Sequence, residues 1–310
     1  MHRREFLAAA AGAAASLAAA QDKPAMLPVI DTHQHLWDLN SFKLGWVTPD
    51  NPLNVSYTPV EYAKAIDGLN VVKSVYMEVD VVPEQQQKEA DTIVALCESK
   101  KTPTCAAVVS GRPNSDGFAK YATQFKGHKF VKGIRQVLHV KETTPEYYLD
   151  PKFVKGIQLL GELGLSFDLC IRPAELPEVA KLVDQCPGTR FILDHCGNPR
   201  GDFTKAQSDA WKKGMGALAT RKHVVCKVSG FIANGYEKGK WTVADLTPVV
   251  NRTIGVFGID RVMFGGDWPV CTLAATYSEW LTALREIIAN RSEAEQKKLL
   301  HDNAAKFYGI

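Results

Sequence analysis

The chain has 310 residues, of which 45% are hydrophobic and 23% are charged, and its formal net charge is +3. These values are typical of a globular domain and exclude a disordered or fibrous chain. Because the net charge is small and the basic residues do not cluster, the composition gives no reason to expect a nucleic-acid partner or a membrane-surface site. We therefore expect a small-molecule substrate.

The first twenty residues have the composition of an export signal. Arg3 and Arg4 stand shortly before an alanine-rich run, residues 8–20, that ends in small residues suited to cleavage. The run is too short and too weakly apolar to serve as a stable membrane anchor. The sequence thus predicts a twin-arginine signal peptide over residues 1–20 and export of the folded protein to the periplasm. An alanine-rich N-terminal helix is the alternative interpretation.

Apolar runs bounded by turn residues alternate with helical patterns along the rest of the chain. The runs predict strands at 29–33, 71–79, 105–109, 130–135, 165–169, 191–195, 224–228 and 261–265. The helical patterns predict helices at 59–67, 84–99, 114–125, 151–163, 176–185, 208–220, 243–257, 277–289 and 292–307. Eight strand–helix units close most naturally into a single-domain (β/α)8 TIM barrel of the α/β class over residues 26–310. An open doubly wound sheet is the alternative, but no Gly-x-Gly-x-x-Gly follows the first strand.

The seven cysteines form no Cys-x-x-Cys pair, and Cys105, Cys170 and Cys226 fall inside predicted strands. A thiol in such a place behaves as a small apolar group. Because a chain of this size does not need disulfides in order to fold, we expect most or all of the cysteines to be free.

Polar side chains stand at the ends of several predicted strands. His33 and His35 come at the end of the first strand, Arg135 at the end of the fourth, His195 at the end of the sixth, and Asp267 just after the eighth. Two histidines two residues apart on a strand share a face, and paired imidazoles suit a divalent metal ion. Because the active site of a (β/α)8 barrel lies at the carboxyl ends of its strands, we expect these side chains to converge. That convergence predicts an enzyme rather than a binding module.

Four motifs carry a resemblance to a known family. They are His33-Gln-His35, Leu193-Asp-His-Cys-Gly-Asn-Pro199, Gly265-Gly-Asp-Trp-Pro269 and Asn303-Ala-Ala-Lys-Phe-Tyr-Gly309. Together they resemble the amidohydrolase superfamily, and more narrowly its amidohydrolase-2 branch, which includes sugar-acid lactonases and dicarboxylate lactonases. The resemblance covers about residues 26–310. It implies a (β/α)8 barrel with four candidate metal ligands around the reacting centre: His33, His35, His195 and Asp267.

Two departures from the superfamily pattern bear on the metal. Many amidohydrolases bridge two metal ions with a modified lysine at the end of the fourth strand, whereas here Lys132 lies inside that strand and Arg135 lies at its end. The fifth strand, with the sequence Phe167-Asp-Leu-Cys170, also carries no histidine. The resemblance therefore implies one divalent ion, Zn²⁺ in type, or no metal at all.

The chemistry of the side chains assigns them candidate roles. Asp267 is the candidate general base, and His195 either binds the metal or polarises the substrate carbonyl. A turn cap and a core histidine are the alternative interpretations of these two residues. Arg135 suits a substrate carboxylate or a developing oxyanion. Trp268, and Trp37 in a long loop expected to cover the barrel mouth, suit the face of a sugar-like ring.

Two further side chains are open to more than one interpretation. Arg135 could instead pair with Glu78 or Asp168, and Asp31 is either a core acid or a partner that orients His33. Distances between strands, which the sequence does not contain, decide between these interpretations.

We therefore predict a hydrolase that opens a cyclic ester, either a sugar-acid lactone or a related carboxylated lactone, by attack of an activated water. A metal-dependent decarboxylase of the same superfamily is the alternative enzyme. A barrel that binds a ligand without turnover is the alternative outside catalysis. The sequence does not determine the exact substrate. It also does not determine the oligomeric state, that is, whether the protein is a monomer or a homo-oligomer.

Overall fold

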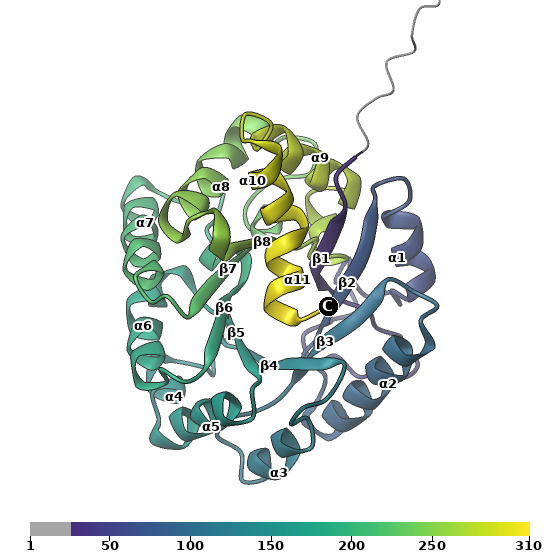
Figure 1. Ribbon diagram of the computed structural model, residues 1–310, viewed down its shortest axis with the longest axis vertical. Helices are drawn as coiled ribbons and strands as arrows, with labels where there is room; N and C mark the ends of the chain where they lie inside the picture. The colour runs from purple at the N-terminus through teal and green to yellow at the C-terminus, as the bar shows by residue number, and fades with distance from the viewer. Residues whose placement is uncertain (1–25) are drawn as a thin grey trace, which may run out of the picture.

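The predicted (β/α)8 barrel is confirmed by the computed structural model, which describes residues 26–310. Eight parallel strands in the order β1 to β8 make the inner ring, and helices surround it (Figure 1). The strands are β1 Val29–Gln34, β2 Val71–Met77, β3 Thr104–Ser110, β4 Val131–Val137, β5 Ser166–Cys170, β6 Arg190–Leu193, β7 Val224–Val228 and β8 Val262–Phe264. The predicted signal peptide, residues 1–20, lies outside the described residues.

The helices follow the predicted order, with three differences. They are α1 Pro59–Ala65, α2 Gln86–Ser99, α3 Phe118–Thr123, α4 Pro145–Tyr148, α5 Pro151–Glu162, α6 Leu176–Gln185, α7 Lys205–Ala219, α8 Val243–Phe257, α9 Tyr277–Ile287, α10 Glu293–Lys297 and α11 Asn303–Tyr308. The short helix α4 was not predicted. α3 begins later than predicted, because the polar and glycine residues at 114–117 form a turn. The predicted last helix is α10 and α11 joined by a π-helical turn, η7 Lys298–Asp302.

Local sequence explains where many of the helices begin. In each case a Thr or Ser side chain accepts from the backbone at the start of the helix, and a Glu, Gln or Asp three residues later bonds back to the backbone of the cap. These capping boxes pair Thr58 with Glu61, Thr204 with Gln207, Thr242 with Asp245, Thr276 with Glu279 and Ser292 with Glu295. The helix starts are therefore fixed by short-range contacts.

The amino end of the barrel is filled by apolar side chains. The inner cluster consists of Ile30, Val75, Met77, Ala106, Val108, Ile192 and Met263, together with Ala304 and Tyr308 from α11. In Figure 1, α10 and α11 lie across this end of the ring of strands. Arg190, at the start of β6, also donates from Nη1 to the Phe307 carbonyl at 2.8 Å. The helix α11 thus covers the amino end of the barrel. The cavity of the barrel opens at the opposite, carboxyl end.

The seam between β1 and β8 is closed by hydrogen bonds of the predicted site residues. The Asp267 amide donates to the His33 carbonyl at 2.8 Å, and the His35 amide donates to the Trp268 carbonyl at 2.8 Å. Lower in the seam, Thr32 Oγ1 donates to the Phe264 carbonyl at 2.6 Å. The same bonds that complete the barrel therefore bring the His-x-His motif against the carboxylate that follows β8.

Asp31 ties this seam to two helices and is the orienting partner left open by the sequence. Its carboxylate accepts from the Gly266 amide at 2.7 Å and from the hydroxyls of Tyr62 and Tyr277 at 2.8 and 3.1 Å. A side chain at Gly266 would bring a Cβ within 2.2 Å of the Tyr277 ring. The Asp31 carboxylate also accepts from the amide of His33 at 2.9 Å, so one buried acid holds the backbone on both sides of the seam.

Two observations concern the whole described chain. No helix within residues 26–310 is long and apolar enough to cross a lipid bilayer. All seven cysteines fall in this range and are free, as the sequence predicted.

Candidate active site

His33, His35 and Asp267 meet at the carboxyl end of the barrel. The two imidazole rings lie with centroids 4.9 Å apart, and Asp267 Oδ1 is 3.6 Å from His33 Nε2 and 3.3 Å from His35 Nε2. All three side chains are buried. The predicted convergence of these residues is therefore found in the structure.

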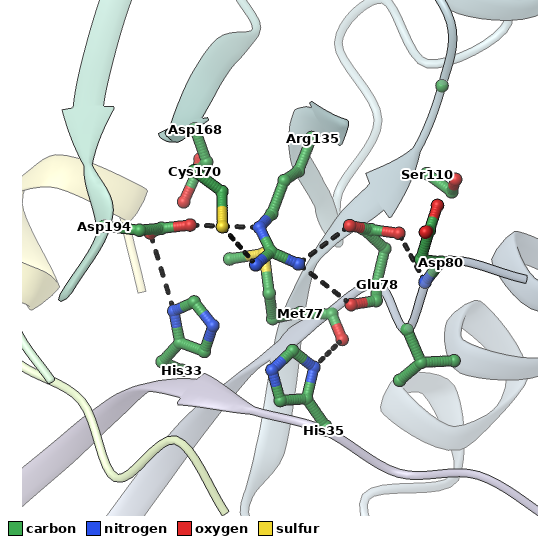
Figure 2. Close-up of polar contacts among 12 residues, drawn as sticks. His33, His35, Met77, Glu78, Asp80, Ser110, Arg135, Asp168, Cys170 and Asp194 are labelled. Atoms are coloured by element: carbon green, nitrogen blue, oxygen red, sulfur yellow. Dashed lines mark hydrogen bonds and ion pairs between the residues drawn. The ribbon is translucent and has the colours of Figure 1, made fainter. Parts of the chain in front are cut away.

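The hydrogen bonding of His35 shows where a cation would fit. His35 Nδ1 lies 3.0 Å from the Met77 carbonyl oxygen, which only accepts, so the proton of the neutral ring is on Nδ1 (Figure 2). The lone pair of Nε2 then faces a carboxylate oxygen of Asp267. Two such groups repel each other unless a proton or a cation lies between them. A bound cation would satisfy both.

His33 presents its second nitrogen to the same place. Its Nε2 is buried and has no hydrogen-bond partner, while its Nδ1 lies 3.5 Å from Asp194 Oδ1. Burial holds the pKa of His33 well below its usual range, so the ring is neutral and able to ligate. A carboxylate behind the far nitrogen of a ligating histidine is the common arrangement at protein metal sites.

The buried charges around this centre leave a deficit of positive charge. Buried carboxylates outnumber buried cations here: Asp31, Glu78, Asp168, Asp194 and Asp267 lie together with Arg135 and Lys227. A divalent cation would offset part of this surplus of negative charge, and uncompensated buried charge is costly. His33, His35 and Asp267 offer two nitrogens and one oxygen within 4.8 Å of one another. This donor set fits a zinc-like ion with room for a further ligand.

His195 reaches the centre through an unusual backbone. Four consecutive residues after β6, His195 to Asn198, have φ between 53° and 71°, in the left-handed region. Such conformations are unfavourable for residues other than glycine and cluster at functional sites. The turn places the His195 ring 4.4 Å from the ring of His33. His195 is thus part of the site, as predicted from its motif.

Gly230, after β7, makes room for that ring. It has φ of 58°, and a Cβ at this position would lie 2.0 Å from His195 Nδ1. The same nitrogen lies 2.9 Å from the buried hydroxyl of Ser229. Burial lowers the pKa of His195, so its imidazole is neutral near pH 7.

Arg135 pairs with Glu78, one of the two partners that the sequence left open, and also with Asp194. Its Nη1 donates to Glu78 Oε1 at 2.8 Å and its Nε to Asp194 Oδ2 at 3.0 Å, while Nη2 lies 3.0 Å from Cys170 Sγ (Figure 2). Arg135 lies two residues inside β4 rather than at its end. Because protein groups already engage its guanidinium, the structure gives little support to the predicted binding of a substrate carboxylate.

The sequence did not predict that Asp168, Asp194 and Lys227 form a buried cluster of ion pairs beside the candidate metal ligands. Asp194 lies between His33 and Arg135, and Lys227 Nζ is 2.5 Å from Asp168 Oδ2 and 3.4 Å from Asp194 Oδ1. A signal was present, because Asp168 and Lys227 each interrupt an apolar strand whose neighbours are buried. Charged residues at such positions are rare unless they are paired.

A cavity of about 250 Å³ opens over the centre. Trp37 and Trp46, from the loop after β1, line one part of it, with ring centroids 5.6 Å apart. Trp37 therefore lines the cavity, which is the position that its predicted contact with a substrate requires. Trp268 is not among the lining residues, because its indole packs against Tyr57 and Tyr62 behind the site. Its predicted contact with the substrate finds no support in this position.

Comparison with known proteins agrees with the fold and the motifs. An L-fucono-1,5-lactonase of Burkholderia multivorans is 26% identical over 91% of this chain and 96% of its own length. An L-rhamnono-gamma-lactonase of Scheffersomyces stipitis is 25% identical over 58% of this chain and 59% of its own length. The crystal structure of an amidohydrolase from Burkholderia multivorans with bound zinc has a TM-score of 0.82 at 23% identity, covering 91% of this chain and 99% of that one. The amidohydrolase family model matches residues 30–310, and the chain therefore belongs to the amidohydrolase family.

Proposed function

We propose that this protein hydrolyses the cyclic ester of a neutral sugar-acid lactone. Relatives that align over most or much of their length are named as lactonases of L-fuconate and L-rhamnonate, both of which form uncharged lactones. The buried ring of His33, His35, His195 and Asp267 supplies the groups that such a hydrolysis needs.

The charge of the cavity is the observation that favours a neutral substrate. Three carboxylates line it, Glu78, Asp80 and Asp267, against the single guanidinium of Arg135. That guanidinium is already paired with Glu78 and Asp194. Apart from a bound metal ion, a substrate carboxylate would therefore find no free cationic side chain to receive it. Of the two lactone classes predicted, the carboxylated one is disfavoured.

The remaining walls suit a polyhydroxylated ring. Trp37 and Trp46 offer aromatic faces for the C–H surface of a sugar. Asp80 binds Nη2 of Arg112 at 2.6 Å through Oδ1 and is half-buried at the cavity. Its second carboxylate oxygen can accept from a substrate hydroxyl.

The proposed reaction adds water to the lactone carbonyl carbon and breaks the ring carbon–oxygen bond. Asp267 accepts a proton from the attacking water and returns it to the departing alkoxide. In the proposed mechanism the Ser229 hydroxyl, 2.9 Å from Nδ1 of His195, donates to that nitrogen. The imidazole then carries its proton on Nε2 and can donate it to the carbonyl oxygen. We propose that one zinc ion is held by His33, His35 and Asp267; when bound, it supplies Lewis-acid polarisation. The product is an open hydroxy acid, which releases one proton at neutral pH.

A pH-indicator assay with a panel of lactones tests the proposal. We expect rapid proton release with L-fucono-1,5-lactone or L-rhamnono-gamma-lactone, and turnover at least about tenfold slower with a lactone of the same ring size that carries an extra carboxylate. The same protein incubated with aromatic and unsaturated acids should release no CO₂. Preference for the carboxylated lactone would contradict the charge argument, and CO₂ release would point to the decarboxylase alternative.

A further inference from the structure

Lys227 is a fully buried lysine on β7 whose ammonium lies within the barrel mouth. Its Nζ is 2.5 Å from Asp168 Oδ2 on β5, 3.4 Å from Asp194 Oδ1 after β6, and 3.5 Å from His33 Nδ1 on β1. The side chain has no solvent exposure. Three elements of the barrel thus direct two carboxylates and one imidazole at a single positive charge.

This ammonium stands next to a second group of possible metal ligands. Ligand atoms of His33, Asp194 and His195 lie within 4.8 Å of one another, so side-chain types alone would allow an ion there as well as at His33, His35 and Asp267. However, Lys227 Nζ already contacts both Asp194 and His33. A divalent ion at the second group would be strongly repelled by a fixed positive charge a few ångströms away in a dry interior.

The environment of Lys227 is also one that a metal ion would accept. The oxygens of the two carboxylates, Asp168 and Asp194, are donors that a divalent ion accepts. Asp168 Oδ1 is buried without a hydrogen-bond partner, so the site keeps unused acceptor capacity. An ammonium fills this place with one positive charge where an ion would bring two.

We propose that the Lys227 ammonium is a built-in cation that takes the place of a second metal ion in this barrel. It pairs with Asp168 and, together with Arg135, with Asp194; it keeps Asp194 against His33 and restricts the protein to one divalent ion at most. Lys227 is therefore a positioning residue for His33 and a determinant of metal stoichiometry. The inference concerns only the number of metal ions that the protein binds, so its test does not depend on whether the proposed lactone is the substrate.

Zinc titration of the metal-free full-length protein tests this. The stoichiometry is measured by isothermal titration calorimetry and checked by elemental analysis after dialysis. Wild type should bind no more than one zinc ion tightly. Lys227→Ala leaves two buried carboxylates without their cation and frees the space, so it should bind one zinc ion more than wild type does. Added zinc should also raise the melting temperature of this variant more than that of wild type.

Three further variants sharpen the result. Lys227→Arg keeps the cation and should retain the wild-type stoichiometry. Lys227→Met combined with Asp168→Asn removes the cation together with a charge that would recruit an ion, and it should also gain no zinc. Lys227→Gln, which keeps a donor for Asp168, should behave as Lys227→Ala and replaces it if the alanine variant does not fold.

Each result of these titrations and folding tests either supports the proposal or overturns it. An extra zinc ion in Lys227→Ala or Lys227→Gln, or folding of either variant only when zinc is present, supports the proposal. Unchanged stoichiometry in a folded Lys227→Ala or Lys227→Gln overturns it. Aggregation of both variants with and without zinc also overturns it, because a metal ion then cannot replace the ammonium.

Discussion

Asp267 lies shortly after the end of β8 and has φ of 55°, and its carboxylate faces Nε2 of His33 and Nε2 of His35. Replacing it by Asn keeps the size of the side chain but removes both the charge and the base. We expect Asp267→Asn to fold and bind substrate, with kcat at least about a hundredfold lower, since general-base catalysis contributes roughly 10²–10⁴-fold. Steady-state kinetics on the best lactone, with circular dichroism as a check on folding, measures this.

Asp80→Asn is the matched control, because Asp80 lines the same cavity but pairs with Arg112 instead of the histidines. This variant should alter KM more than kcat, as expected for a group that contacts a substrate hydroxyl throughout the reaction. Near-normal kcat in Asp267→Asn would show that Asp267 is not the general base, and His195 would then be the next candidate for that role.

Gly230 offers a second test at the scale of one residue. In Gly230→Ala the new methyl group would lie 2.0 Å from His195 Nδ1, on a backbone with φ of 58°. We expect the His195 ring to be displaced and kcat to fall at least about tenfold, with about 1–3 kcal/mol lost from the free energy of unfolding. Kinetics and chemical denaturation measure the two effects.

A glycine in open space provides the comparison. Gly255 lies on the exposed side of α8, where an added methyl group would meet no heavy atom within 4 Å. Gly255→Ala should therefore leave kcat unchanged and stabilise the protein by up to about 1 kcal/mol. If Gly230→Ala behaved in the same way, His195 would not depend on the space beside it.

The residues of the site differ in how far the sequence could predict them. His33 and His35 lie at the end of β1, and His195 and Asp267 follow β6 and β8. The order of strands in a barrel is enough to bring them to one mouth. The partners of Arg135 depend on distances across the barrel interior, where β2, β4 and β6 approach each other without being adjacent in sequence. No local pattern encodes those distances, so Glu78 was one of two candidates and Asp194 was missed.

At the scale of elements, a buried carboxylate joins α2 to the end of β2. Glu89 Oε1 accepts from the Val79 amide and the Tyr76 hydroxyl, both at 2.9 Å, while Oε2 has no partner. Burial, aided by the nearby charge of Glu78, raises the pKa of Glu89 to about 8. In the unfolded chain the same carboxyl has a pKa of about 4.3.

This difference predicts how stability changes with pH. Between about pH 4.3 and pH 8 the folded state holds one proton more, so the free energy of unfolding falls by up to about 1.4 kcal/mol per pH unit. Glu89→Gln resembles the protonated acid at every pH. The melting temperature of the variant relative to wild type should therefore rise by roughly 5 °C between pH 5 and pH 9.

Calorimetry at the two pH values measures this rise, with the exposed Glu84→Gln as the control that should show none. An equal melting-temperature difference at both pH values would mean that Glu89 is ionised in the folded protein throughout this range.

Strands and helices were largely predictable because their apolar periodicity and capping residues are local. The boundaries that moved depend on contacts instead. β4 continues to Val137 because it pairs with β5 up to Cys170, which lengthens the strand beyond Arg135. The π-helical turn between α10 and α11 lies where Leu299 and Leu300 are both buried, a demand of packing that the helical pattern does not reveal.

At the scale of the whole molecule, we propose that the protein is exported to the periplasm through the twin-arginine pathway. The paired arginines and the alanine-rich run in residues 1–20 support this. A reporter fused to residues 1–25 should reach the periplasm, and replacing both arginines, Arg3→Lys with Arg4→Lys, should abolish its export. Arrival of the reporter in a strain without the twin-arginine translocase would show that another route carries it.

The position of α11 has a consequence for biosynthesis. Tyr308 and Ala304 fill the amino end of the barrel against Ile30 of β1, so the last of these elements to leave the ribosome packs on the first. Strands β1 to β8 are therefore all synthesised before the interior they enclose can be sealed. The amino end of the barrel is covered only after α11 has emerged, and its apolar side chains stay without this cover until then.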